Sequence, residues 1–150
     1  MKAVFLAHLL ATLTMFGVIW VVQVVHYPLF SGVGESGWAD YEARHQSRIT
    51  LVVAPAMLIE LATAVWLVLD RPPAFPAWAV LAGVVLVGVV WVSTAFVQVP
   101  LHNALGGAFD AGAHARLVAT NWIRTAAWTA RAGLVLWLSW RAMSPSAFGS

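Results

Sequence analysis

Four apolar blocks, each long enough to cross the hydrocarbon core of a bilayer as a helix, make up most of this chain of 150 residues. They cover approximately residues 3–25, 49–69, 78–99 and 117–140. A helix that rises about 1.5 Å per residue needs about 20 apolar residues to cross roughly 30 Å of hydrocarbon. Only 9% of the residues are charged, which is too few to cover the surface of a soluble domain. We therefore predict one all-α domain over residues 1–150, an integral membrane bundle of four helices.

The polar segments between these blocks predict how the chain meets the membrane surface. Residues 37–48 (GWADYEARHQSR) place Trp38, Tyr41 and His45 along one face of a short helix. An amphipathic helix of this kind lies at the interface, here between the first two spans. Four spans put both termini on one side of the membrane. We predict a multi-pass protein of the bacterial inner membrane with cytoplasmic termini, for which the lipid bilayer is the first partner.

The composition excludes several classes of chemistry. There is no cysteine, so disulfides, iron–sulfur clusters and thiol chemistry are ruled out. The net charge of +2 comes from eight basic and six acidic residues, and no basic patch or arm suits nucleic acid. A metal ion would have to be bound by His, carboxylate, amide or Met side chains.

An internal repeat is visible at the ends of the first and third blocks. WVVQVVHYPL begins at Trp20 and FVQVPLHNAL begins at Phe96, and each contains Val-Gln-Val, a His, a Pro and a Leu. RHQSRITLVV then leads into the second block, and HARLVAT leads into the fourth. Two tandem helical hairpins would explain the match, as would chance in so apolar a sequence. Under duplication, His26 corresponds to His102 and His45 to His114.

Three charged side chains fall inside the predicted spans: Glu60, Arg124 and Arg131. A charged group in hydrocarbon costs at least a few kcal/mol unless it has a partner. The helical rise places Glu60 between the two arginines in depth, so that either arginine could reach it. One interpretation is a buried Glu–Arg pair that fixes helix packing. A second makes Glu60 a catalytic base or metal ligand and Arg124 the catalytic anchor of an anionic or phenolate oxygen, and the two interpretations are compatible.

Four histidines are predicted to lie at one end of the bundle: His26, His45, His102 and His114. Imidazole together with a carboxylate is typical of transition-metal sites. We predict a metal ion, Fe or Cu, bound by His26, His45 and His102, with Glu60 or His114 completing the set. Two alternatives stay open. His26 and His102 could be the axial ligands of a haem, or the imidazoles could simply occupy the headgroup region.

The fourth block is unusually polar for a membrane helix between residues 120 and 125. Asn121 and Arg124 share one helical face. Such a polar stripe must face the bundle interior, because lipid offers no hydrogen-bond partners. We predict a polar substrate pocket in the outer half of the bundle, formed by Asn121, Trp122, Arg124 and Gln98.

Two stretches, VPLHNALGGAFD and HARLVATNWIRTAAWTAR, resemble the third loop and last span of the anthrone-oxygenase-like family of small four-span membrane proteins. HYPLF at the end of the first block and VVAPAML in the second are also similar to that family. His102 stands where the family pattern has Asn. The resemblance implies oxygenation of a polyketide-type phenolic substrate within the membrane.

Taken together, these patterns favour a membrane-embedded, metal-dependent oxidoreductase that acts on a lipophilic phenol or quinol. The rival interpretation is a non-enzymatic accessory subunit or carrier whose buried Glu–Arg pair is structural. A haem-binding electron-transfer protein is a further alternative. A homo-oligomer is compatible with any of the three.

Overall fold

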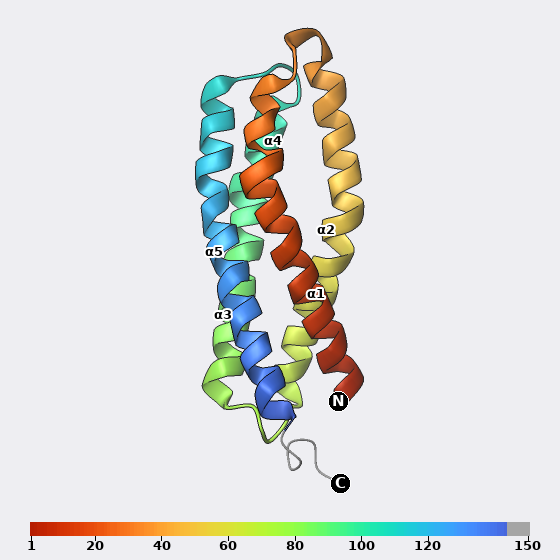
Figure 1. The fold of residues 1–150 in the computed structure, drawn as a ribbon, viewed down its shortest axis with the longest axis vertical. Coiled ribbons are helices and arrows are strands. Elements are labelled where there is room, and N and C mark those ends of the chain that lie inside the picture. The colour runs from red at the N-terminus through yellow and green to blue at the C-terminus, as the bar shows by residue number, and fades with distance from the viewer. Residues whose placement is uncertain (144–150) are drawn as a thin grey trace.

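The computed structural model describes residues 1–143 and shows four helical segments packed side by side (Figure 1). The first segment consists of α1 (Lys2–Val21), η1 (Val22–His26) and η2 (Pro28–Gly32). The second consists of η3 (Glu35–Gly37) and α2 (Trp38–Leu69). The third consists of α3 (Ala77–Ser93), η4 (Thr94–Gln98) and α4 (Val99–Leu105), and the fourth is α5 (Ala111–Ala142). No strand occurs among the described residues, so the prediction of an all-α fold is confirmed.

Three of the four segments are long and apolar enough to cross a membrane. They are Lys2–Gly32, Glu35–Leu69 and Ala77–Leu105. The chain is therefore a helical membrane protein. α5 is as long as α2, at 32 residues each, but it carries Arg124 and Arg131 and is not among these three.

The interfacial helix predicted over residues 37–48 is not a separate element, because these residues form the first turns of α2. No glycine or proline interrupts the chain between Gly37 and Pro55. An ion pair one turn apart, Arg44 Nη2 to Asp40 Oδ2 at 2.9 Å, also supports the helix here. α2 is about 48 Å long at about 1.5 Å per residue, so it extends well beyond roughly 30 Å of hydrocarbon.

α5 likewise begins before the predicted fourth span, at Ala111. The side chain of Asp110 caps it, since one carboxylate oxygen accepts a hydrogen bond from the amide of Ala113 at 2.5 Å. Such an N-cap satisfies an amide that has no partner inside the helix. The polar start of α5 is therefore a solvated extension of the helix rather than a loop.

The first and third segments each contain a π-helical turn directly before a proline. In η1 the amide of Tyr27 donates to the carbonyl of Val22 at 2.9 Å, and in η4 the amide of Val99 donates to the carbonyl of Thr94. The prolines that follow have no amide hydrogen, so the regular ladder of hydrogen bonds cannot continue through them. Both turns fall on the Val-Gln-Val stretches of the internal repeat, and π-turns are frequent at functional sites.

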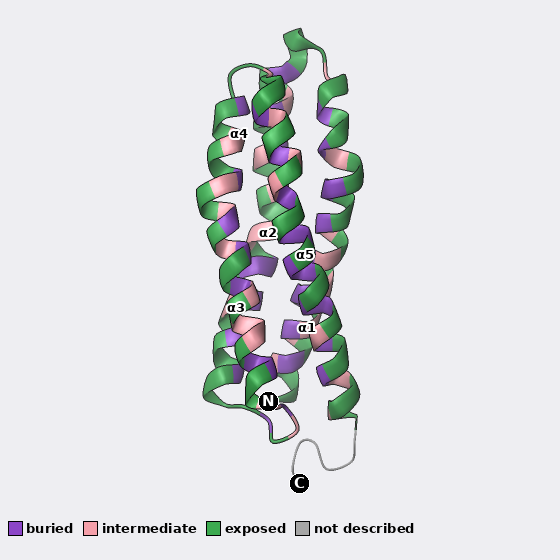
Figure 2. Ribbon diagram, turned by 90° about the vertical axis from the view of Figure 1, so that its left-hand side faces the viewer, coloured by how far each residue is buried: buried purple, intermediate pink, exposed green. Residues whose placement is uncertain are grey.

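Buried residues lie along the inner faces of all four segments (Figure 2). They form three apolar layers along the bundle, and polar side chains lie between the layers. The central layer packs Met15, Ile19, Met57, Val90 and Trp128. Most exposed large side chains of the helices are apolar, as expected of a surface that faces lipid.

A buried ion pair lies in the half of the bundle nearer the termini. Glu60 Oε1 accepts from Arg131 Nε at 2.7 Å and from Thr12 Oγ1 at 2.8 Å, while Glu60 Oε2 accepts from Trp128 Nε1 at 3.0 Å. Arg131 and Glu60 are each 1% exposed.

Arg131 also connects the ion pair to the other helices. Its Nη1 donates to the carbonyl of Gly83, and its Nη2 lies 3.3 Å from His8 Nε2. We call Thr12, Glu60, Arg131, Trp128 and His8 the ion-pair cluster. Because its side chains and the carbonyl of Gly83 come from α1, α2, α3 and α5, it links all four segments.

Removing one member of the pair should destabilise the bundle strongly. We expect Glu60→Ala to lower the free energy of unfolding by about 3–5 kcal/mol, because it leaves a buried guanidinium without its carboxylate. Replacing both partners, as in Glu60→Leu with Arg131→Leu, should recover most of this loss. Thermal unfolding of the detergent-purified protein, followed by circular dichroism, measures both effects.

The matched control is Arg116→Ala, since Arg116 is an exposed arginine on the same helix, α5. A surface change of this kind should stay within about 0.5 kcal/mol. A loss in Glu60→Ala no larger than that of the control would contradict a structural role for the pair.

Candidate functional site

Four imidazoles surround one phenyl ring at the end of the bundle opposite the termini. Phe30 is fully buried, and each of the four histidine rings lies against it. The distances between ring centroids are 5.1 Å to His26, 5.1 Å to His45, 6.2 Å to His114 and 6.5 Å to His102. We call these four histidines, with Tyr27, Phe30 and Glu42, the histidine cluster.

Within this cluster, a carboxylate, an imidazole and a phenol form a continuous hydrogen-bonded chain. His102 Nδ1 lies 2.6 Å from Glu42 Oε1, and His102 Nε2 lies 2.8 Å from the hydroxyl of Tyr27. Glu42 is fully buried, and Tyr27 is 4% exposed. A carboxylate only accepts hydrogen bonds, so Nδ1 of His102 carries a proton, and in the neutral imidazole Nε2 then accepts from Tyr27. We call Glu42, His102 and Tyr27 the relay.

A second hydrogen bond joins His26 of η1 to His45 of α2. His26 Nε2 lies 2.8 Å from His45 Nδ1. The His45 ring lies 5.3 Å from the His102 ring, so this pair adjoins the relay. His45 Nε2 and Glu42 Oε2 are buried and have no hydrogen-bond partner among the described residues.

Local structure explains why these side chains meet. The π-turn of η1 and the turn after it bring His26, Tyr27 and Phe30 to the same end of the bundle. Glu42 and His45 are three residues apart on α2 and therefore share one face. Two hydrogen bonds between segments connect the remaining parts of this end of the bundle. His114 Nε2 lies 2.8 Å from the carbonyl of Tyr27, and Trp38 Nε1 donates to the carbonyl of Leu105 at 2.6 Å.

A small cavity adjoins the relay between α2, η4, α4 and α5. Its volume is about 130 Å³, and its polar lining residues are Tyr27, Gln46, Thr50, Thr94, Gln98, His102 and Arg124. Gln98 Oε1 and Arg124 Nε are both buried without a hydrogen-bond partner among the described residues. Val99 also lines the cavity and is 48% exposed, so the opening lies on the lipid-facing side. We call this the relay cavity.

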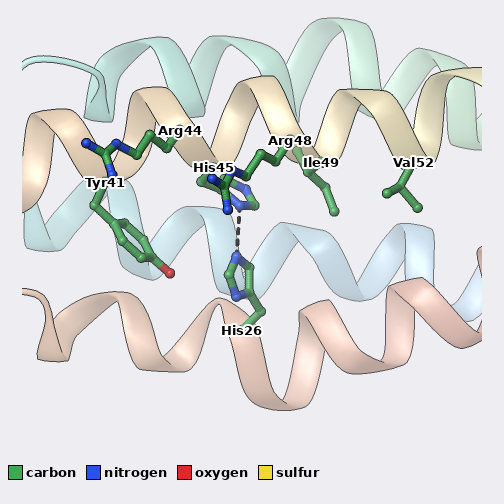
Figure 3. Close-up of a pocket in the computed structure, with 7 residues that line it drawn as sticks. All are labelled: His26, Tyr41, Arg44, His45, Arg48, Ile49 and Val52. Carbon is green, nitrogen blue, oxygen red and sulfur yellow. Dashed lines mark hydrogen bonds between the residues drawn. The ribbon is translucent and has the colours of Figure 1, made fainter.

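A larger groove lies on the other side of the same part of α2 (Figure 3). Its volume is about 430 Å³, and α2 supplies all of its lining residues except one. His26 faces α2 from η1, and its hydrogen bond to His45 forms the inner wall. We call this the interface groove.

The predicted site residues divide among three places. The four histidines come together in the histidine cluster, as described above. Glu60 lies elsewhere, in the ion-pair cluster, where both of its carboxylate oxygens already accept hydrogen bonds. Its partner there is Arg131 rather than Arg124.

Arg124 lies one layer further out, on the side of the relay. Its guanidinium is next to the Tyr27 side chain, donates to Asn121 Oδ1 at 3.3 Å and lies 5.3 Å from the centre of the Trp128 ring. Gln98 and Arg124 both line the relay cavity, as a substrate pocket would require. Asn121 supports this region from behind, because its amide donates to Gln23 Oε1 at 2.9 Å.

Trp122 is the one predicted substrate residue that points away from the bundle. Its side chain is 48% exposed and packs edge-on against Trp20, with 5.8 Å between ring centroids. The structure therefore does not bring Trp122 to the relay cavity.

The histidine cluster does not have the arrangement of a metal centre. No group of three or more His, Asp or Glu side chains among the described residues converges on one point suited to a metal ion. The phenyl ring of Phe30 packs against all four imidazoles, and the rings of His26, His45 and His102 lie directly beside one another. Both ring nitrogens of His102, and Nε2 of His26 and of His114, already have hydrogen-bond partners. A metal ion at these histidines stays a prediction from sequence alone, and we derive no chemistry from it.

The haem alternative meets the same difficulty. A haem needs a wide, flat space between its two axial ligands. Here the ring of Tyr27 lies 6.5 Å from that of His26 and 5.5 Å from that of His102. Tyr27 thus packs beside both histidines, and a haem between them stays a prediction from sequence alone.

Sequence reasoning did not select Glu42, Tyr27 or Phe30, although each is central to the cluster. The sequence does contain a signal for Glu42, because Glu42 and His45 have the spacing of a Glu-x-x-His pair on one helix. Tyr27 follows His26 directly, but only the π-turn determines that its hydroxyl points to His102. Nothing in the sequence distinguishes Phe30 from the other six phenylalanines.

Comparisons with known proteins give no match: no protein family, curated protein or solved structure is similar to this chain. The class that the fold and the site define is therefore a helical membrane protein with a buried histidine cluster at one end of its bundle.

Metal analysis of the purified protein tests the arrangement. Because nitrogens of all four imidazoles already have hydrogen-bond partners, we expect mass spectrometry of the metals in detergent-purified protein to find Fe and Cu far below stoichiometric amounts. Stoichiometric Fe or Cu that is lost in His45→Ala would contradict this expectation and would support the metal site predicted from sequence.

Proposed function

We propose that this protein is a membrane-embedded oxidoreductase that oxidises a lipophilic phenol or quinol, with the relay as its acid–base machinery. The observation that carries the proposal is the Glu42–His102–Tyr27 chain beside a cavity in which two further polar residues, Gln98 and Arg124, each retain a buried atom without a partner among the described residues. The resemblance to the anthrone-oxygenase-like family agrees with this substrate class.

In the proposed arrangement all four helical segments cross the bilayer. α5 buries its polar residues, among them Asn121, Arg124 and Arg131, and exposes apolar ones such as Ile123 and Leu136. A helix with this distribution is stable in lipid as part of a bundle. Both ends of the described chain then lie on one side, and we retain the predicted bacterial inner membrane and cytoplasmic termini.

The relay has the chemical parts of a proton-transfer chain. Tyr27 donates to the free nitrogen of His102, and Glu42 would stabilise the imidazolium that forms when His102 takes this proton. A substrate hydroxyl beside Tyr27 could then pass its own proton to the tyrosine oxygen. Arg124, next to Tyr27, would stabilise the phenolate left on the substrate.

The polar atoms of the relay cavity suit a hydroxyl group. Gln98 Oε1 accepts hydrogen bonds and Arg124 Nε donates them, and neither has a partner among the described residues. A phenolic oxygen can accept from Arg124 Nε, and its single proton is donated to Gln98 Oε1 on binding and redirected to Tyr27 for the proton transfer. Buried polar atoms without partners cost about 1–3 kcal/mol each, which favours a ligand that pairs with them.

The proposed reaction balances with molecular oxygen as the oxidant. A quinol gives up two electrons and two protons, O₂ takes up both, and the products are the quinone and hydrogen peroxide. Removal of a proton by the relay makes the substrate more electron-rich and therefore easier to oxidise. The proton held on the relay is returned to the reduced oxygen. The residues of this chain thus supply binding and proton transfer, and the substrate supplies the electrons.

The ion-pair cluster favours a second candidate, a non-enzymatic accessory subunit or carrier. Both oxygens of Glu60 are occupied by donors from α1 and α5, as a purely structural carboxylate would be. This candidate makes no use of the relay, so the two proposals differ in what they expect of His102.

Oxygen consumption with a lipophilic quinol tests the proposal. We expect the detergent-purified protein to consume O₂ and form peroxide, and His102→Ala and Tyr27→Phe each to lower kcat/KM by about 10²–10⁴-fold, the usual contribution of a general base. An oxygen electrode and a peroxide assay measure the rates. Trp122→Phe, on the outer surface, should leave them unchanged. No turnover by the wild-type protein, or equal activity in His102→Ala, would favour the accessory-subunit candidate.

The size of the relay cavity predicts the size of the substrate head. A cavity of about 150 Å³ is known to hold one benzene ring, and the relay cavity has about 130 Å³. We therefore expect a single-ring alkylated quinol to be oxidised with a kcat/KM at least about tenfold above that of a three-ring anthrone, equivalent to about 1.4 kcal/mol. Faster oxidation of the three-ring compound would show that the cavity expands or that the substrate binds elsewhere.

A further inference from the structure

We infer that the interface groove binds an anionic phospholipid, with its phosphate held by Arg44 and Arg48. This groove has one lining residue, Ile49, in common with the relay cavity, and the inference does not depend on the proposed function. Tyr41, Arg44, Arg48 and Val52 line it from α2, and His26 lines it from η1 (Figure 3).

Arg48 gives the groove a positive charge that no acidic side chain among the described residues neutralises. Arg48 is exposed and has no hydrogen-bond or ion-pair partner among the described residues. Arg44 pairs with Asp40, but both side chains of this pair are 69% exposed and therefore well screened by solvent. Arg44 and Arg48 are one helical turn apart and lie on the same side of α2, at the groove.

The depth of these arginines matches the phosphate level of a bilayer. The apolar part of α2 begins after Arg48, and residues 49–69 are about 31 Å long, close to the thickness of the hydrocarbon core. Arg48 therefore lies at the boundary, and Arg44 lies about 6 Å further out. Basic side chains at this depth attract anionic headgroups.

The rest of the groove is suited to the apolar part of a lipid. Ile49 and Val52 continue its lining toward the hydrocarbon, and Val52 is 48% exposed. Leu51 and Val25 are exposed by 77% and 50% on the neighbouring surface of α2 and η1. An occupant of the groove thus meets cations at one end and an apolar wall at the other. Its volume of about 430 Å³ is within the usual range of ligand sites.

Binding of short-chain lipids to the detergent-purified full chain tests the inference. Short-chain phosphatidylglycerol should bind more tightly than phosphatidylcholine of the same chain length, as measured by thermophoresis or native mass spectrometry. Arg48→Gln should weaken phosphatidylglycerol binding about fivefold, since a basic residue at the surface contributes about that factor, and should leave phosphatidylcholine binding unchanged. Arg116→Gln, an exposed arginine at the same end but outside the groove, is the matched control.

Two further measurements decide between a lipid and a soluble anion. Glycerol phosphate, which has the anion but no acyl chains, should bind at least about tenfold more weakly than the lipid because it buries no apolar surface. In the wild-type protein, raising the salt from low to about 0.5 M should remove most of the preference for phosphatidylglycerol, because screening acts on exposed charges. This arm holds even if Arg48→Gln fails to fold.

Three outcomes would overturn the inference. Equal affinity for the two lipids would show that the arginines do not select an anion. An equal loss in Arg116→Gln would show a general charge effect rather than a site. Glycerol phosphate binding as tightly as the lipid would identify a site for a soluble anion.

Discussion

The Glu60–Arg131 ion pair is the constraint on which the rest of the bundle depends. Hydrocarbon offers no hydrogen-bond partner, so a carboxylate and a guanidinium at this depth must satisfy one another and must face inward. Their inward direction fixes the rotation of α2 and α5 about their axes. Thr12 and His8 fix α1 through the same cluster, and the carbonyl of Gly83 fixes α3. With the helices held in this way, their ends on the side opposite the termini face one another in a defined orientation.

That orientation separates two kinds of polar site. Near the termini, the donors and acceptors of the ion-pair cluster are matched, and Glu60 has no free oxygen. At the other end the matching is incomplete, because Glu42, His45, Gln98 and Arg124 each keep one buried atom without a partner among the described residues. Buried polar groups are nearly always paired in folded proteins, so several unpaired ones close together beside a cavity support the proposed site, whereas Trp91 and Ser93 keep single unpaired atoms outside it. This difference is why Glu42, rather than Glu60, is the carboxylate of the proposed chemistry.

The sequence predicted most of the architecture and part of the site. Apolar length alone indicated helices that cross a membrane, and the gathering of four histidines at one end followed from where the helices begin and end. Glu60 was correctly expected to be buried with an arginine, but two arginines lay within reach, and only the rotation of α5 decides between them. The roles of Tyr27 and Phe30 could not be predicted, because they depend on the π-turn, and a period of 3.6 residues does not describe such a turn. The composition of the first turns of α2 predicts a separate interfacial helix, because it differs from that of the span that these turns continue.

The π-turn of η1 holds one residue more than an α-helical turn would, and the extra residue is taken up within the turn itself. Deleting any one residue between Val22 and His26 would let the helix close into regular α geometry. Because a π-turn advances the chain about as far as the shorter α-helical turn that would replace it, the residues on either side would keep their positions. In evolutionary terms, a single-codon insertion or deletion at this point can change which side chains line the turn without displacing either the relay or the ion-pair cluster.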